Sequence, residues 1–137
     1  SFINLVIEKP WKLHSKHLLI KYKMEDGVVT VEQFWLKNLW EICSTSSTWP
    51  VKVQYKNKVI VNIRPSVWYS DRADFSPFES LEDFLAAIEE TIYQYPDTRT
   101  TIALHWKEKL MKSYQNHYGR TLNIPRWYDI KHKYVKE

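Results

Sequence analysis

The stretch WPVKVQYKNKVIVNIRP, residues 49–65, alternates apolar and polar side chains on both sides of a short polar turn. Apolar residues recur at every second position before and after that turn: Val51, Val53, Tyr55, Val59, Val61 and Ile63. Successive side chains of a strand point to opposite faces, so this spacing predicts an antiparallel β-hairpin with one apolar face. Pro65 follows the hairpin and is expected to end it.

Two helices are expected after this hairpin. Ser80 is a suitable N-cap for a helix over about residues 81–93, whose apolar residues recur at helical spacing: Leu81, Phe84, Leu85, Ile88 and Ile92. The acidic residues of this helix fall on its other side, which indicates a solvated face: Glu82, Asp83, Glu89 and Glu90. A second helix is expected over about 98–118, because Gly119 supplies a C-terminal stop.

These elements together predict the fold class. A hairpin with one apolar face and two amphipathic helices bury their apolar surface by packing on each other. We therefore expect an α+β protein, in which an antiparallel sheet is covered by two or three amphipathic helices. A length of 137 residues fits one domain over 1–137.

The remaining segments are predicted from shorter patterns. Alternation predicts strands at residues 3–7 and 18–24, a short strand at 68–69 and an edge strand at 128–134. Residues 31–43 fit both a strand and a helix. Val29 and Val31 extend a strand, whereas a capping box at Thr30 and Gln33 and the spacing of later apolar residues favour a helix. We choose the helix over 31–43.

Composition excludes several classes of protein. Two glycines are too few for phosphate-cradling loops, so a nucleotide-binding enzyme is disfavoured. A single cysteine, Cys43, forms no internal disulfide and supports no structural zinc site. The chain has no run of about 20 apolar residues and no signal-peptide pattern. We expect a cytoplasmic protein without a membrane partner.

No catalytic, cofactor or metal site is readable from the spacing of reactive residues. Cys43 ends an apolar segment, where a thiol behaves as a small hydrophobe. His14 and His17 lack a third metal ligand nearby in sequence. His105 and His117 are about three helical turns apart, which is too far to bind one ion. The sequence therefore predicts a protein that is not an enzyme and has no cofactor.

Charge is distributed unevenly along the chain. Residues 71–90 carry seven acidic residues and one arginine, whereas residues 105–137 carry eight basic residues and three acidic ones. Such asymmetry suggests a charged partner.

The block VWYSDRADFSPFESLEDFLAAIEETI, residues 67–92, resembles small bacterial immunity proteins, including those of contact-dependent growth inhibition systems. The shared pattern is a strand, an acidic aromatic loop and an amphipathic helix. The resemblance implies a non-catalytic cytosolic module that acts as an antitoxin, binding and neutralising a cognate bacterial toxin, often a nuclease.

The partner-binding surface is predicted within the same block. Its acidic residues would steer a toxin with a cationic surface, and its aromatic residues would anchor the toxin: Trp68, Tyr69, Asp71, Asp74, Phe75, Glu79, Glu82 and Asp83. A loop packed on its own sheet is the other interpretation of this block, and is equally open.

A nucleic-acid-binding module is the alternative function. In the C-terminal segment, cations that suit phosphates alternate with rings that can stack on bases: Arg120, Arg126, Trp127, Tyr128, Lys131, Lys133 and Tyr134. The charge excess is small, so this hypothesis ranks second, and an enzyme of unrecognised type ranks third.

Overall fold

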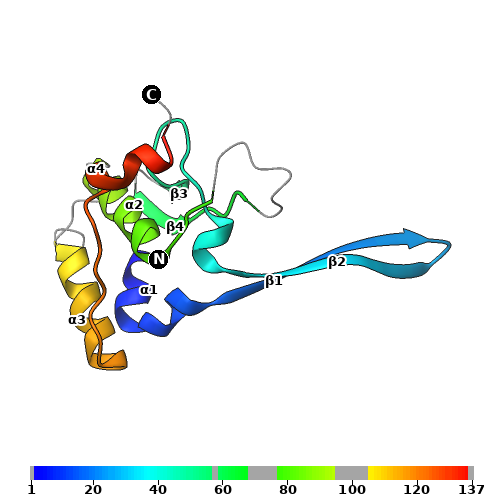
Figure 1. The fold of residues 1–137 in the computed structure, drawn as a ribbon, viewed down its shortest axis with the longest axis horizontal. Helices are drawn as coiled ribbons and strands as arrows, with labels where there is room; N and C mark the ends of the chain where they lie inside the picture. Colours follow the sequence, from blue (N-terminus) through cyan, green and yellow to red (C-terminus); the bar gives the residue numbers. More distant parts are fainter. Residues whose placement is uncertain (1, 57–58, 68–76, 95–104, 136–137) are drawn as a thin grey trace.

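The computed structural model describes residues 2–56, 59–67, 77–94 and 105–135. Helices and two antiparallel strand pairs make up this part of the chain (Figure 1). In chain order the elements are α1 (Phe2–Glu8), the 3-10 helix η1 (Pro10–His14), β1 (Lys16–Glu25), β2 (Val28–Asn38), the 3-10 helix η2 (Leu39–Ile42), β3 (Val53–Lys56), β4 (Val59–Ile63), α2 (Leu81–Gln94), α3 (Trp106–Tyr118), α4 (Trp127–Ile130) and the 3-10 helix η6 (Lys131–Lys133).

The predicted α+β class is confirmed. The hairpin around residues 51–63 is present as β3 and β4, with Val53 opposite Ile63. Its strands form one two-stranded antiparallel sheet, and β1 and β2 form a second one. That residues 1–137 make a single domain stays a prediction.

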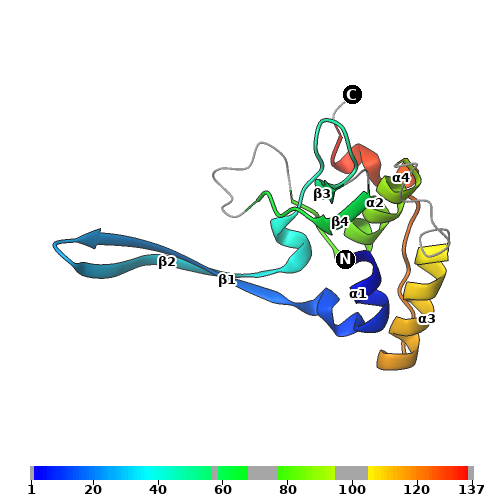
Figure 2. The ribbon, with the colours of Figure 1, turned by 180° about the vertical axis from the view of Figure 1, so that it is seen from behind.

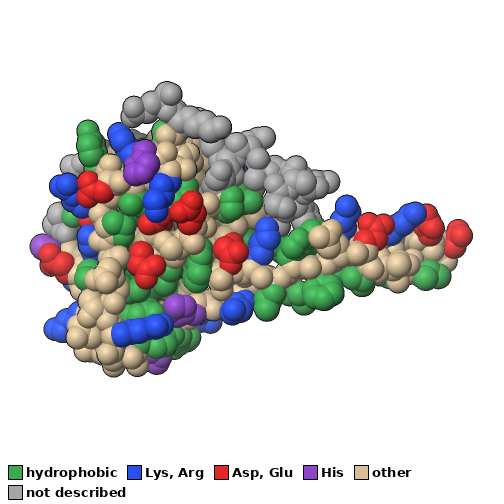
Figure 3. Space-filling view, viewed as in Figure 1, with side chains coloured by type: hydrophobic (Ala, Val, Ile, Leu, Met, Phe, Trp, Pro, Cys, Tyr) green, Lys and Arg blue, Asp and Glu red, His purple; other side chains and the backbone are tan. Residues whose placement is uncertain are grey.

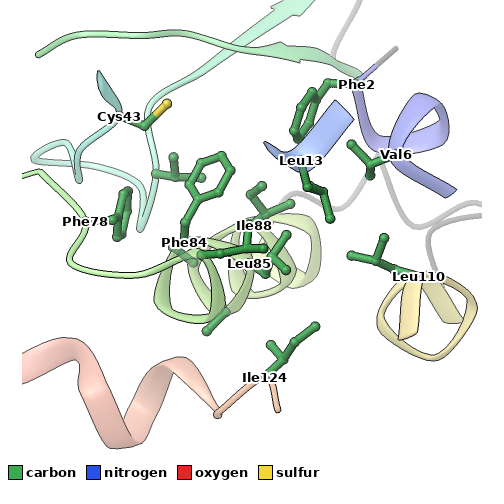
Figure 4. Close-up of a cluster of buried hydrophobic side chains, with 14 of the residues drawn as sticks. Phe2, Val6, Leu13, Cys43, Phe78, Phe84, Leu85, Ile88, Leu110 and Ile124 are labelled. Atoms are coloured by element: carbon green, nitrogen blue, oxygen red, sulfur yellow. The ribbon is translucent and has the colours of Figure 1, made fainter. Parts of the chain in front are cut away.

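Helix α2 lies at the centre of the helical body. Figure 4 shows Phe84, Leu85 and Ile88 among buried side chains from several other segments of the chain. The helix is present at residues 81–94 as predicted, but it is buried on most sides. The expectation of a solvated acidic face was wrong for Asp83, which is only 5% exposed.

The predicted strand at residues 3–7 was wrong, because this segment forms α1. Phe2, Ile3 and Val6 all point into the core. The indole nitrogen of Trp106 donates a hydrogen bond to the carbonyl of Ile3 at 2.8 Å. Packing against α3 therefore overrides the local alternation of apolar residues.

The predicted helix over residues 31–43 was also wrong, because β2 runs through to Asn38. A bulge in the β1–β2 pairing places one extra residue, Glu32, in β2, since Lys21 pairs with Gln33 and Tyr22 with Val31. Before the bulge the apolar residues of this face are Val29 and Val31, and after it they are Phe34 and Leu36. The change from odd to even positions breaks the alternation that would have predicted a strand. The capping box forms later, at Asn38 and Glu41.

The predicted edge strand at residues 128–134 was wrong too. The segment forms α4 and η6, with Trp127, Ile130 and Tyr134 buried at helical spacing. The strand predicted at residues 68–69 and the predicted start of the second helix at about 98 lie outside the described residues. That second helix is described from Trp106 onward as α3.

The β1–β2 hairpin projects from the helical body, as both ribbon views show (Figures 1 and 2). Its tip is formed by Asp26 and Gly27, which both have positive φ angles, 51° and 78°. This backbone suits a two-residue turn between twisted strands. At the base of the hairpin, Leu39 donates a backbone hydrogen bond to Ser15 at 3.1 Å. The two strands are therefore held together by the turn at the tip and by this hydrogen bond at the base.

Candidate functional site

The acidic segment predicted to bind a partner is only partly described. Five of its residues lie outside the described ranges: Trp68, Tyr69, Asp71, Asp74 and Phe75. Glu79 and Glu82 lie around the start of α2, beside a cavity. The carboxylate of Asp83 accepts hydrogen bonds from the Tyr134 hydroxyl at 2.6 Å and from Lys133 Nζ at 3.1 Å. Asp83 thus joins α2 to the C-terminal segment, and partner binding by this set of residues stays a prediction.

The basic aromatic C-terminal segment is largely occupied with internal contacts. The rings of Trp127 and Tyr134 are buried and stacked, with centroids 5.8 Å apart. Tyr128 is 76% exposed, with the Lys131 ammonium 4.6 Å from its ring centroid. Arg126 pairs with Asp129 at 3.4 Å. Among the described aromatic residues of this segment, only Tyr128 is open for stacking on a base.

A cavity of about 340 Å³ lies between η1, the start of α2 and the end of α3. Its lining combines acidic, basic and aromatic side chains: His14, Trp40, Glu79, Ser80, Leu81, Glu82, Tyr114, Arg120, Thr121 and Leu122. The Tyr114 hydroxyl accepts a hydrogen bond from Arg120 at 3.0 Å and lies 2.7 Å from Nε2 of His14. Burial lowers the pKa of His14, and the charge of Arg120 lowers it further, whereas Glu82 raises it. A neutral His14 ring donates or accepts this hydrogen bond at Nε2 according to its tautomer.

Exposed lysines occur beside and within η1 and on α3, two elements that pack against each other. Ser113 and Trp106 fix α3 along α1 through hydrogen bonds to the carbonyls of Ile7 and Ile3. The rings of Trp11 and His117 lie 5.0 Å apart at the next turn. We call the exposed lysines of these neighbouring segments the basic face: Lys9, Lys12, Lys109 and Lys112.

The outer side of α3 carries part of this basic face. Lys109, Lys112 and Asn116 follow at spacings of three and four residues, so they share one side of the helix, and Gln115 is exposed next to them. Neither lysine has an acidic partner among the described residues. Lys107 points elsewhere and pairs with Glu89 at 3.6 Å. The unpaired lysines are free to contact an external anion.

The two faces of the β1–β2 hairpin differ in character. Figure 3 shows hydrophobic side chains along one edge of the hairpin and charged ones along the other. The register places eight apolar side chains on one face, which we call the apolar face: Leu18, Ile20, Tyr22, Met24, Val29, Val31, Phe34 and Leu36. The opposite face carries Lys21, Lys23 and Gln33, and Lys23 pairs with Glu25 at 2.7 Å.

The described residues do not assemble a metal centre or an activated nucleophile. They contain no group of three His, Cys, Asp or Glu side chains that could hold a metal ion. Cys43 is buried, and burial raises its pKa to about 12, so the thiol stays protonated. None of the helices in the described ranges is long and apolar enough to cross a membrane.

Comparison with known proteins settles the family. The family model for NgoBV restriction endonuclease matches residues 1–134. The chain belongs to the NgoBV restriction endonuclease family. It is 45% identical over 134 residues to the type II restriction enzyme NlaIV of Neisseria lactamica, covering 96% of this chain and 55% of that protein. A solved structure of NlaIV restriction endonuclease superposes with a TM-score of 0.84 at 43% identity, covering 99% of this chain and 56% of that one.

Membership of the NgoBV restriction endonuclease family corrects the functional prediction. The hypothesis of an immunity protein that neutralises a toxin in contact-dependent growth inhibition was wrong, and so was the prediction that the protein is not an enzyme, because the relatives are restriction endonucleases. The nucleic-acid alternative agrees better with the family. Lys109 and Lys112 were not among the predicted site residues, although their spacing of three residues places both on one side of a helix.

Proposed function

We propose that this chain acts in a type II restriction endonuclease, in which it binds double-stranded DNA at a defined sequence for cleavage. The observation that carries the proposal is the family match over residues 1–134, together with 45% identity to an enzyme of that kind. The chain spans about half the length of the relatives it matches. DNA binding is the part of the activity that the described residues support.

The basic face supports contact with the DNA backbone. Lys109 and Lys112 are exposed on α3, at the periphery of the helical body (Figure 1). Lysines without internal partners release condensed counterions when they meet phosphates, which gives sequence-independent affinity that falls with salt. Lys9 and Lys12, beside and within η1, are exposed as well.

Helix α3 also carries side chains that can read bases. The major groove of B-DNA admits an α-helix, and Asn or Gln can form a bidentate pair with adenine there. Gln115 and Asn116 are exposed beside Lys112, one turn before the helix ends at Gly119. We assign phosphate contacts to the lysines and base contacts to these amides.

The described residues do not support a cleavage mechanism by themselves. Phosphodiester hydrolysis in nucleases commonly relies on divalent metal ions held by carboxylates. The described part of the chain offers no such ligand group, so we derive no catalytic step from it.

A binding experiment tests the proposal. Fluorescence anisotropy would compare a duplex that contains the site cut by the Neisseria lactamica enzyme with a duplex in which that site is scrambled. The purified chain is expected to bind the cognate duplex more tightly, with an affinity that falls as salt rises from 50 to about 200 mM. Undetectable binding at low salt, or binding of both duplexes without any salt dependence, would rule the proposal out.

A further inference from the structure

The apolar face of the β1–β2 hairpin is the largest apolar surface that the described residues leave uncovered. Its eight side chains, from Leu18 to Leu36, are exposed to between 46% and 69%. The helical body has its own core, to which the opposite side of the hairpin contributes Leu19 near the base. The hairpin projects away from that body in both ribbon views, so the body does not cover the apolar face (Figures 1 and 2).

The size of this face is that of an interface. Eight side chains exposed to this degree present on the order of 800 Å², which is what each partner buries in a standard protein interface. Contiguous apolar patches larger than a few hundred Å² usually mark interaction sites. In addition, an isolated two-stranded hairpin is at best marginally stable in water, so strands of this length need a packed face.

We propose that the apolar face docks a further polypeptide segment, the counterpart of the part of the relatives that lies outside the match, whether it is joined to this chain or separate. The relatives exceed this chain by nearly half of their own length. The solved relative matches 99% of this chain, so its matched part includes the hairpin. Its additional residues belong to the same protein as that matched part. That additional segment is therefore available to cover the apolar face.

The chemistry of the occupant follows from the face. The register places no charged residue among its eight side chains. A matching surface is therefore an apolar sheet or helix face that packs flat on the hairpin, about 10 Å away if it is a sheet. The opposite face, with Lys21 and Lys23, stays in water.

Co-expression tests the proposal without DNA. This chain, carrying an affinity tag, would be produced together with the segment of the Neisseria lactamica enzyme outside the match, and light scattering would give the stoichiometry. The expected result is a one-to-one complex. Phe34→Lys places a charge in the apolar face and is expected to weaken the complex at least about 30-fold. Gln33→Lys adds the same charge one residue away on the opposite face and is expected to leave it unchanged.

Three outcomes would overturn the proposal, provided that circular dichroism shows the variants to be folded. The first is failure to capture the segment. The second is a complex that Phe34→Lys and Gln33→Lys affect equally, which would place the contact elsewhere. The third is a homodimer of this chain that Phe34→Lys dissociates, which would make the face an interface between two copies. None of these results bears on DNA binding. The proposed function is tested separately, by the anisotropy experiment.

Discussion

The hydroxyl of Tyr134 donates a hydrogen bond of 2.6 Å to the carboxylate of Asp83, across 51 positions of sequence. The same hydroxyl accepts the backbone N–H of Glu79 at 3.0 Å. Burial raises the pKa of Tyr134, and the bond to Asp83 raises it further. The phenol therefore stays protonated and connects the start of the central helix to the C-terminal segment.

Replacement of Asp83 tests how far this contact stabilises the fold. Asp83→Ala is expected to lower the free energy of unfolding by about 2 kcal/mol, because it leaves the Tyr134 hydroxyl without its acceptor. Urea unfolding followed by circular dichroism would measure the loss. Glu79→Ala is the matched control, since its exposed carboxylate pairs with Lys133 only at 3.5 Å and should cost about 0.5 kcal/mol or less. Equal losses in both variants would contradict a special role for Asp83.

The pKa shift of His14 predicts a pH-dependent stability. Burial and Arg120 lower the pKa of the folded state below 6.5. As the pH falls below 6.5, the unfolded chain takes up a proton that the folded chain does not, so stability declines until the folded pKa is passed. His14→Gln should remove this decline. Urea unfolding at pH 8 and pH 5.5 checks it, with the exposed His132→Gln as control; the decline should persist in that variant.

Burial of Cys43 predicts a thiol that does not react in the native protein. Its pKa is raised to about 12 by burial, so at pH 8 almost no thiolate is present. A disulfide reagent at pH 8 should label the native chain far more slowly than the chain in urea. Labelling at the same rate in both conditions would show that the segment around Cys43 opens readily.

The sequence predicted the elements whose signals are local and uninterrupted. The α2 helix and the β3–β4 hairpin have regular periods and clear ends, and both are present. The β1–β2 hairpin was half recognised, because the bulge at Glu32 broke the alternation in β2. Segments 3–7 and 128–134 were misassigned because a short alternating run of apolar residues fits both a strand and a helix. Packing on distant residues decides between the two, as the contact of Trp106 with residue 3 shows.

The site was less predictable than the fold. The proposed DNA-binding surface combines segments about 100 residues apart, around Lys12 and Lys112, so it has no continuous motif in the sequence. The acidic block was predicted to be the binding surface instead, although Asp83 makes an internal contact with Tyr134. The apolar face of the β1–β2 hairpin, which we propose packs against another polypeptide, resembles core in the sequence, because the spacing of apolar residues does not say which surface covers them.

The lysines of α3 are expected to provide sequence-independent affinity for DNA. Lys109→Gln and Lys112→Gln should each weaken binding of cognate and scrambled duplexes alike, and each should reduce the slope of log affinity against log salt by about 0.9. Lys107→Gln is the control on the same helix, because its ammonium is directed toward Glu89. A salt slope that changes more for Lys107→Gln than for the other two would place the DNA on another side of α3.

Asn116 is expected to provide discrimination instead. Its amide lies one turn beyond Lys112 on the outer side of α3. There it can form a bidentate hydrogen-bonded pair with adenine, which a lysine does not form. Asn116→Ala should therefore cost about 1–3 kcal/mol of binding to the cognate duplex and leave affinity for the scrambled duplex nearly unchanged. The salt slope should stay the same, because no cation is lost. Anisotropy titrations of both duplexes at two salt concentrations separate these quantities. If Asn116→Ala weakens both duplexes equally, the residue contacts the backbone, and base recognition belongs to another surface of the chain.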